Sequence, residues 1–145
     1  MIIVDTALAR RSAENNPVRV ALVGGGYMAR CIALQIVSAI RGMRLVAIAN
    51  RTVEKAERAY RDAGVTEFSR VDTVSELEQA IAQGRYAVTD DALMMCRAGL
   101  IDAVIECTGH VEFGTRVCFE AIRHGKHTIL LGAEIDASVG PILKT

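Results

Sequence analysis

Apolar residues occur along the chain in two alternating kinds of segment. Short runs that are β-branched or continuously apolar predict strands at residues 18–23, 45–49, 86–89, 101–107 and 127–131. Segments with helical spacing predict helices at 27–41, 52–64, 73–84 and 110–124, and a further helix that ends at Gly99. Residues 65–72 have neither pattern and are predicted to be irregular. Because strands alternate with helices, we predict an α/β fold of three layers, α/β/α, with a doubly wound parallel sheet.

The residues at the ends of the predicted helices agree with this assignment. Gly42 and Gly64 are suitable C-terminal stops, because glycine adopts the backbone conformation that ends helices. Thr52 is a suitable N-cap, and Thr73 with Glu76 has the spacing of a capping box. The predicted helices therefore have defined starts and stops.

Length and composition indicate one folded domain preceded by a short lead. Residues 1–17 form a polar, charged lead or helix, and residues 18–145 form the α/β domain. Hydrophobic residues make up 51% of the 145 residues, and 17 Lys and Arg balance 17 Asp and Glu, so a nucleic-acid partner is not expected. No apolar run approaches the roughly 20 residues of a membrane span, and charges within residues 1–16 argue against a signal peptide. We expect a cytoplasmic protein without a membrane partner.

A glycine-rich segment lies between the first predicted strand and the first predicted helix. Its sequence, Gly24-Gly25-Gly26-Tyr27-Met28-Ala29, has the G-x-G-x-x-A spacing that carries weight only in this context. The first glycine permits a tight turn, the third lets the backbone approach a pyrophosphate, and Ala29 lets the helix pack closely on the strand. Free N–H groups and the dipole at the helix start favour phosphate. The segment predicts a dinucleotide site; the alternative is a glycine-rich turn without a ligand.

The junction after the second predicted strand indicates which dinucleotide is bound. NAD-binding domains usually place Asp or Glu there to hold the ribose hydroxyls. This chain has Asn50, followed by Arg51 and Thr52. A neutral amide tolerates the extra phosphate of NADP, Arg51 can pair with it, and Thr52 can add a hydroxyl and helix amides. NADP is therefore preferred over NAD, unless Arg51 is only a solvated loop residue.

A third candidate segment, Cys107-Thr108-Gly109, follows the strand predicted at residues 101–107. In doubly wound sheets the ligand lies outside the carboxyl ends of the strands, where the strand order reverses. This strand is expected to lie beside the strand that carries the glycine loop, so its end can contact the ribose and nicotinamide side of the cofactor. Glu106 is interpreted as structural. The alternative for Thr108 is a plain helix cap.

No other pattern predicts a metal or catalytic site. The four cysteines, at positions 31, 96, 107 and 118, form no CxxC pair and no zinc spacing, and we interpret them as reduced core residues. The histidines at positions 110, 124 and 127 lie around one predicted helix without evident catalytic partners. The catalytic residues are therefore not identified from the sequence.

Four segments together form a recognisable set: the glycine loop, residues 49–52, residues 105–109 and the closing Gly132-Ala133-Glu134-Ile135-Asp136-Ala137-Ser138-Val139-Gly140-Pro141. They resemble the homoserine dehydrogenase-like oxidoreductases, and within them the longer proteins whose Rossmann domain precedes a SAF domain, including the deoxyxylulose phosphate reductoisomerase-like enzymes. Glu134 and Asp136 match the family, whereas Gly132 stands where the family usually has Asn. Sugar oxidoreductases with a Glu-Lys-Pro motif after the fifth strand fit less well.

The resemblance implies hydride transfer between NADP and a small hydroxy or oxo compound. Family members are much longer and take substrate-binding and catalytic groups from later segments, so this segment alone is expected to be inactive. Glu134 and Asp136 are expected on opposite sides of an extended segment, either near the substrate or as plain surface carboxylates. We also expect exposed apolar surface and self-association into a homo-oligomer.

Two alternatives of other classes stay open. One is a stand-alone nucleotide-binding or redox-sensing module, which a protein that ends naturally at residue 145 would favour. The other is a binder of the S-adenosylmethionine type, which is disfavoured because position 50 lacks an acidic residue for the ribose hydroxyls.

Overall fold

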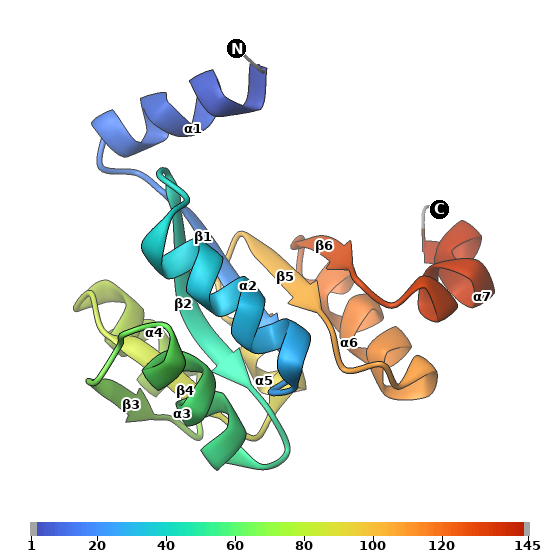
Figure 1. The fold of residues 1–145 in the computed structure, drawn as a ribbon. Helices are drawn as coiled ribbons and strands as arrows, with labels where there is room; N and C mark the ends of the chain where they lie inside the picture. The colour runs from blue at the N-terminus through green and yellow to red at the C-terminus, as the bar shows by residue number, and fades with distance from the viewer. Residues whose placement is uncertain (1–2, 144–145) are drawn as a thin grey trace.

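The computed structural model describes residues 3–143, and its centre is a six-stranded sheet (Figure 1). The strands are β1 (Val18–Val23), β2 (Met43–Ala49), β3 (Phe68–Arg70), β4 (Tyr86–Thr89), β5 (Ala103–Glu106) and β6 (His127–Leu130). Their order is β3-β4-β2-β1-β5-β6, and every neighbouring pair is parallel. After β1 the chain adds β2, then β3 at the edge and β4 between them, and it returns to the other side of β1 for β5 and β6. The doubly wound parallel sheet is thereby confirmed.

Helices cover both faces of the sheet. Val20 and Leu22 of β1 pack with α2 (Tyr27–Ser38) and α3 (Val53–Asp62). Ala21 and Val23 belong to the opposite core, which also contains residues of α4 (Val74–Ala82), α5 (Ala92–Arg97) and α6 (Val111–Arg123). Because alternate side chains of a strand point to opposite faces, one strand contributes to both cores. The three-layer arrangement is confirmed.

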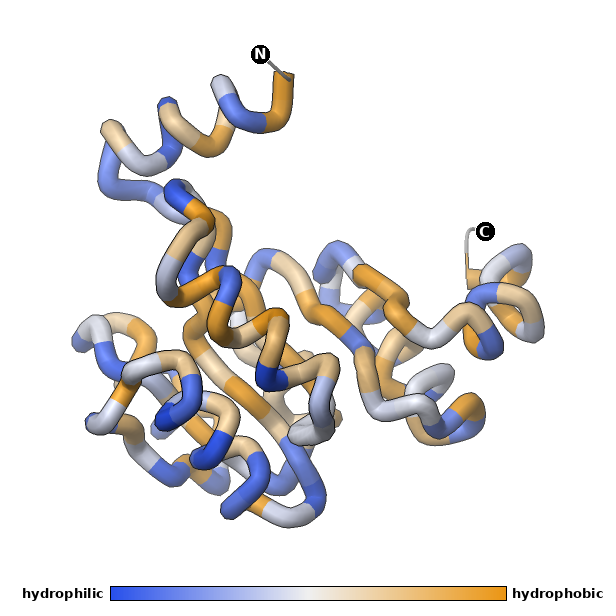
Figure 2. The backbone as a smooth tube through the Cα atoms, viewed as in Figure 1, coloured by the Kyte–Doolittle hydropathy of each residue, from blue (hydrophilic) through white to orange (hydrophobic). Residues whose placement is uncertain are grey.

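The central strands are apolar on both faces because both faces are covered. Leu45 to Ala49 of β2 are at most 1% exposed, and Figure 2 shows the apolar colours that follow this strand. Burying a side chain such as Leu45 or Ile48 contributes about 1.5–3 kcal/mol each. The predicted continuous apolar run therefore marks the middle of the sheet.

The prediction that residues 65–72 are irregular is wrong, because Phe68–Arg70 forms the edge strand β3, paired with β4. Its three residues are too few to show an alternation of apolar and polar positions. The ring of Phe68 stacks at 6.0 Å from that of Tyr60, which is fully buried on α3. A contact made across the fold, rather than a local pattern, fixes this strand.

The closing segment was also predicted wrongly, because it forms helix α7 (Ala133–Leu143) instead of an extended segment. The carbonyl of Gly132 accepts hydrogen bonds from the N–H groups of Ile135, at 3.1 Å, and Asp136, at 3.3 Å. Ile135 is completely buried and attaches the first turn to the domain. Pro141 lies inside this helix, where it removes one backbone donor.

Within the lead of residues 1–17, α1 (Ile3–Ala13) is helical and has no buried residue. It extends away from the sheet in Figure 1. Other boundaries differ from the predictions by a few residues, since α2 ends at Ser38 and β5 starts at Ala103. The predicted elements otherwise lie where the pattern placed them.

Candidate dinucleotide-binding site

Three loops meet at the carboxyl edge of the sheet because β1 lies between β2 and β5. Val23, the last residue of β1, is level with Ala49 of β2 and with Glu106 of β5. The N–H of Gly24 donates to the carbonyl of Ala49 at 2.9 Å, and that of Cys107 donates to the carbonyl of Val23 at 3.0 Å. The expected neighbour relation between β1 and the strand before Cys107 is confirmed. The three candidate segments therefore start at one level, beside the point where the strand order reverses.

Gly24 makes the tight turn after β1. Its φ of +129° is unfavourable for residues with a side chain, and a Cβ there would lie 2.9 Å from the Sγ of Cys107. The Sγ of Cys107 lies 3.2 Å from the carbonyl oxygen of Val23, and burial, together with Glu106, raises the pKa of this thiol to about 12. Cys107, which follows β5, thus packs against the start of the glycine loop.

The start of α2 has features that suit a phosphate. Gly26 is the N-cap and provides no side-chain acceptor, so the first N–H groups of the helix are free of a side-chain cap. A Cβ on Gly26 would meet no described protein atom within 4 Å, so packing inside the protein does not require glycine here. Ala29 is fully buried, whereas Tyr27 and Met28 are 73% and 53% exposed. The backbone at Gly26 is therefore open to a ligand.

The junction after β2 lies directly against the glycine loop. A Cβ on Gly25 would lie 3.0 Å from the Cγ of Asn50. The Nδ2 of Asn50 donates to the carbonyl of Thr52 at 2.8 Å, which holds the amide in place. Thr52 is the N-cap of α3, as predicted, and its side chain makes no capping hydrogen bond. Arg51 is exposed at the tip of the junction.

Lys55 is a basic residue at this site that the sequence analysis missed. It lies in the first turn of α3, and a Cβ on Gly25 would lie 2.7 Å from the Cβ of Lys55. Both Arg51 and Lys55 are exposed, and neither forms an ion pair with the rest of residues 3–143. The spacing of four residues between these two cations, across a helix start, is the signal that could have identified the pair. Two unpaired cations therefore flank Asn50.

The loop after β5 is organised by Glu106. This residue is 1% exposed, and its Oε1 accepts hydrogen bonds from the N–H of Thr108, at 2.7 Å, and from the hydroxyl of Thr108. The N-cap of α6 is His110, whose N–H donates to the Oγ1 of Thr108 at 3.2 Å. Gly109 is exposed. Thr108 is thus not the N-cap itself, although its oxygen binds one N–H at the start of the helix.

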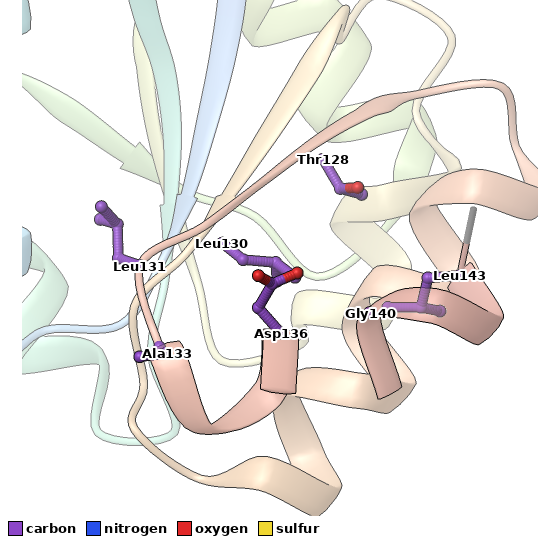
Figure 3. Close-up of a pocket in the computed structure, with 8 residues that line it drawn as sticks. Thr128, Leu130, Leu131, Ala133, Asp136, Gly140 and Leu143 are labelled. Atoms are coloured by element: carbon purple, nitrogen blue, oxygen red, sulfur yellow. The ribbon is translucent and has the colours of Figure 1, made fainter. Parts of the chain in front are cut away.

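Glu134 and Asp136 lie on α7 and are exposed, so they are not on opposite sides of an extended segment. Asp136 lines a hollow of about 530 Å³ between the end of β6 and α7, together with Thr128 and Leu130 (Figure 3). Its carboxylate packs against Gly140 one turn later. The helix places Asp136 beside β6, and Glu134 is exposed in the first turn of the same helix.

The other titratable residues form no further site among the described residues. No group of three His, Cys, Asp or Glu side chains within residues 3–143 is arranged to hold a metal ion. All four cysteines are free; Cys96 and Cys118 are buried, as predicted, while Cys31 and Cys107 are only half-buried. His124 lies 3.4 Å from Glu120 on the same helix. None of the helices in the described part of the chain is both long and apolar enough to span a membrane.

The parallel sheet, the glycine turn after β1 and the reversal of strand order beside it define an NAD(P)-binding domain of the Rossmann type, as found in oxidoreductases. The chain belongs to the family described as shikimate / quinate 5-dehydrogenase, whose model matches residues 7–90, more than half of the chain. No curated protein matches the chain.

Solved dehydrogenase structures have the same fold. They include a homoserine dehydrogenase from Thiobacillus denitrificans (21% identity, TM-score 0.63, covering 88% of this chain and 26% of that chain). A second is the myo-inositol dehydrogenase from Lactobacillus casei in complex with NAD(H) and myo-inositol (22% identity, TM-score 0.59, covering 79% of this chain and 28% of that chain). The myo-inositol 2-dehydrogenase from Lactobacillus plantarum is also similar (19% identity, TM-score 0.62, covering 88% of this chain and 33% of that chain). The chain thus spans about a quarter to a third of their length.

Proposed function

We propose that this chain is the NADP-binding domain of an oxidoreductase that transfers hydride between NADP(H) and a small hydroxy or oxo compound. The observation that carries the choice of cofactor is the junction after β2. A neutral side chain, Asn50, lies against the glycine loop, and two exposed, unpaired cations, Arg51 and Lys55, flank it. A carboxylate in place of Asn50 would repel the 2′-phosphate of NADP, whereas these cations attract it.

The remaining contacts of the cofactor follow from the three loops. The backbone from Gly24 to Ala29 and the start of α2 would hold the pyrophosphate, because Gly26 leaves its N–H groups uncapped. Asn50, Arg51, Thr52 and Lys55 would hold the adenosine end. The loop of Cys107, Thr108 and Gly109 would contact the nicotinamide half. The bound nicotinamide supplies or accepts the hydride, and this domain positions it.

The substrate and the catalytic residues would come from a longer protein, since the solved structures are three to four times the length of the aligned domain. Shikimate, quinate, myo-inositol and homoserine, named in the comparisons, all carry hydroxyl groups. We propose a hydroxyl or carbonyl substrate of this kind, in a cytoplasmic protein of the SAF-domain-containing, reductoisomerase-like group. Residues 18–145 would then be the cofactor domain, with Glu134 and Asp136 near the substrate side.

Association of copies is also proposed, because large apolar side chains are exposed on α6 and β6. Phe119 is 56% exposed, Ile129 is 42% exposed, and Leu131, which follows β6, is 44% exposed. Light scattering across a concentration series should show an apparent mass that rises with concentration. A constant monomer mass would contradict this proposal without touching the cofactor assignment.

Titration with NADPH and with NADH, followed by nucleotide fluorescence or heat, tests the proposed function. Tight NADPH binding with weak NADH binding is expected. Similar affinities would contradict the role of the Asn50 junction while leaving a dinucleotide site, and no binding of either would contradict the site itself. A panel of alcohols and carbonyl compounds with the full protein separates an oxidoreductase from a stand-alone binding module, because only the former shows turnover.

A further inference from the structure

Glu106 has a buried carboxylate of which only one oxygen is used. Its Oε1 accepts two hydrogen bonds from Thr108, from the backbone N–H at 2.7 Å and from the hydroxyl. Its Oε2 is buried and has no hydrogen-bond partner among the described residues. The side chain forms no ion pair within residues 3–143. A buried carboxylate without a cation is costly, so its retention in the domain requires an explanation.

The surroundings of Glu106 show what holds the carboxylate. A Cβ on Gly114 of α6 would lie 2.9 Å from the Cδ of Glu106 and 3.1 Å from its Oε1, so α6 can approach only with glycine there. A Cβ on Gly132, the residue before α7, would lie 3.9 Å from Oε2. In the first turn of α7 the N–H groups of Ile135 and Asp136 donate to the carbonyl of Gly132, those of Ala133 and Glu134 have no acceptor within the helix, and this end of the helix dipole favours negative charge. Glu106 therefore binds the loop after β5 and is packed between this loop, α6 and the start of α7.

The hydrogen bonds of Glu106 fix the direction in which Thr108 can bind a ligand. A threonine hydroxyl has one proton, and Thr108 gives it to the Oε1 of Glu106. The hydroxyl oxygen itself, Oγ1 of Thr108, accepts the N–H of His110 at 3.2 Å. What the Oγ1 of Thr108 has left is acceptor capacity and not a proton. A ligand group that approaches Thr108 must therefore be a donor.

We propose that Glu106 is a positioning residue that fixes the Oγ1 of Thr108 as an acceptor for a donor group of the nicotinamide half of the cofactor, either a ribose hydroxyl or the carboxamide NH₂. This inference rests on the proposed function, because it deepens the role of the same site. Glu106 does not itself reach the cofactor, since it is covered by α6 and by the start of α7. Its effect passes through Thr108.

The substitution E106Q tests this chain of contacts with almost no change in volume. A glutamine amide can offer its oxygen to Thr108 only by turning its NH₂ group toward Gly132 and the positive end of the α7 dipole, where a donor is unfavourable. We expect E106Q to weaken NADPH binding by up to about tenfold, the effect of losing one hydrogen bond between uncharged groups of Thr108 and the cofactor. Binding of 2′,5′-ADP, which lacks the nicotinamide half, should change less than twofold. E112Q, at an exposed glutamate in the first turn of α6, is the matched control.

A double-mutant cycle with T108V separates positioning from plain structural support. If Glu106 acts through Thr108, the double variant E106Q/T108V should bind NADPH no more weakly than T108V alone. Losses that multiply in the double variant would overturn the proposal. So would an equal loss of NADPH and 2′,5′-ADP in E106Q, which would indicate general damage to the fold. Thermal unfolding of each variant monitors the fold directly.

Variants at Thr108 keep the proposal testable if E106Q does not fold. T108S retains a hydroxyl that can donate to Glu106 and should bind NADPH like the wild type, whereas T108V should lose about tenfold. T115V, which removes a hydroxyl that donates to the carbonyl of Val111, is the control. Equal binding by T108S and T108V would overturn the proposal. If the wild type itself binds neither NADPH nor 2′,5′-ADP, the proposed function fails instead.

Discussion

The substitution Arg51→Ala should weaken NADPH binding much more than NADH binding, because only NADPH carries the 2′-phosphate. Arg51 is exposed and has no ion-pair partner among the described residues, so its guanidinium is available to the ligand. Two unit charges about 4 Å apart attract each other by about 1 kcal/mol in water. A phosphate monoester carries roughly −1.5 to −2 at pH 7. The expected loss is therefore about 2 kcal/mol, which corresponds to about thirtyfold in Kd.

Ionic strength and pH provide independent readouts of the same interaction. The Debye length falls from about 10 Å at 0.1 M salt to about 3 Å at 1 M salt, so the preference for NADPH should shrink as salt rises. It should also shrink below about pH 6, where the phosphate gains a proton and loses one negative charge. In Arg51→Ala both dependences should be weaker than in the wild type. Fluorescence titrations at several salt concentrations and pH values measure them.

Two further variants define the control and the refuting result. Lys55→Ala should also weaken NADPH binding more than NADH binding. The double variant of Arg51→Ala and Lys55→Ala should show the largest loss of NADPH affinity. Arg85→Ala removes an equal charge just before the amino end of β4, whereas the three loops lie at the carboxyl ends of the strands, and it should leave both Kd values unchanged. If Arg51→Ala weakens NADPH and NADH by equal factors, the electrostatic argument for NADP is refuted.

Three other predictions concern stability and reactivity. Gly24→Ala should lower the Tm and abolish dinucleotide binding, because the φ of +129° is unfavourable for alanine and the added methyl group would lie 2.9 Å from the Sγ of Cys107. Gly26→Ala should leave the Tm unchanged, because a Cβ there meets no described atom, but it should still weaken dinucleotide binding. Burial raises the pKa of Asp102, but hydrogen bonds from the backbone and side chain of Arg19, at 2.8–3.2 Å, outweigh it and lower the pKa of this carboxyl. The resulting stability is present above the unfolded pKa of about 3.9 and lost as pH falls through the lower folded value, so Asp102→Asn should lower the Tm by about 3–5 °C at pH 7 and by less at pH 3; an equal shift at both values would contradict this. Burial and Glu106 raise the pKa of the Cys107 thiol to about 12, so little of it is thiolate at pH 8, and alkylation of this residue in the folded protein should be slow; rapid labelling that disappears in Cys107→Ser would contradict the burial argument.

Local patterns in the sequence predicted most of the fold. The capping box at Thr73 and Glu76 is present, with the N–H of Glu76 donating to the Oγ1 of Thr73 at 3.2 Å. The glycine loop could be placed because its strand and its helix each have a strong pattern of their own. Long apolar runs with clear ends are determined by residues close in sequence, so one chain is enough to find them.

The missed elements depend on contacts between distant residues. The strand β3 exists because Phe68 stacks on Tyr60 and pairs with β4, and three residues carry no period of their own. The helix α7 starts where Ile135 is buried beside Gly114 of α6, more than twenty positions earlier. Neither partner is visible in the local sequence.

For the candidate site too, the positions at the strand ends could be predicted, whereas contacts between distant residues could not. The glycine loop, Asn50 and Thr108 were found because the topology of a doubly wound sheet brings the strand ends after β1, β2 and β5 together, and the structure places them there. Their role in binding the cofactor stays a prediction. Lys55 was missed because its contact with Gly25 joins two helix starts. The environment of Glu106 could not be predicted because residues on later elements create it, Gly114 on α6 and Gly132 before α7.

The two edge strands of the sheet, β3 and β6, differ in how readily they can pair with another strand. At one end β3 is only three residues long, and Arg70 on it is held by Glu54 and Glu57, so charge surrounds a short row of free backbone groups. At the other end β6 carries the exposed Ile129, an apolar side chain without such protection. Charged, short edges resist the addition of another strand, whereas apolar edges accept it. A further strand, from the same chain or another copy, is therefore opposed by charge at β3, whereas at β6 it meets an apolar side chain beside α7.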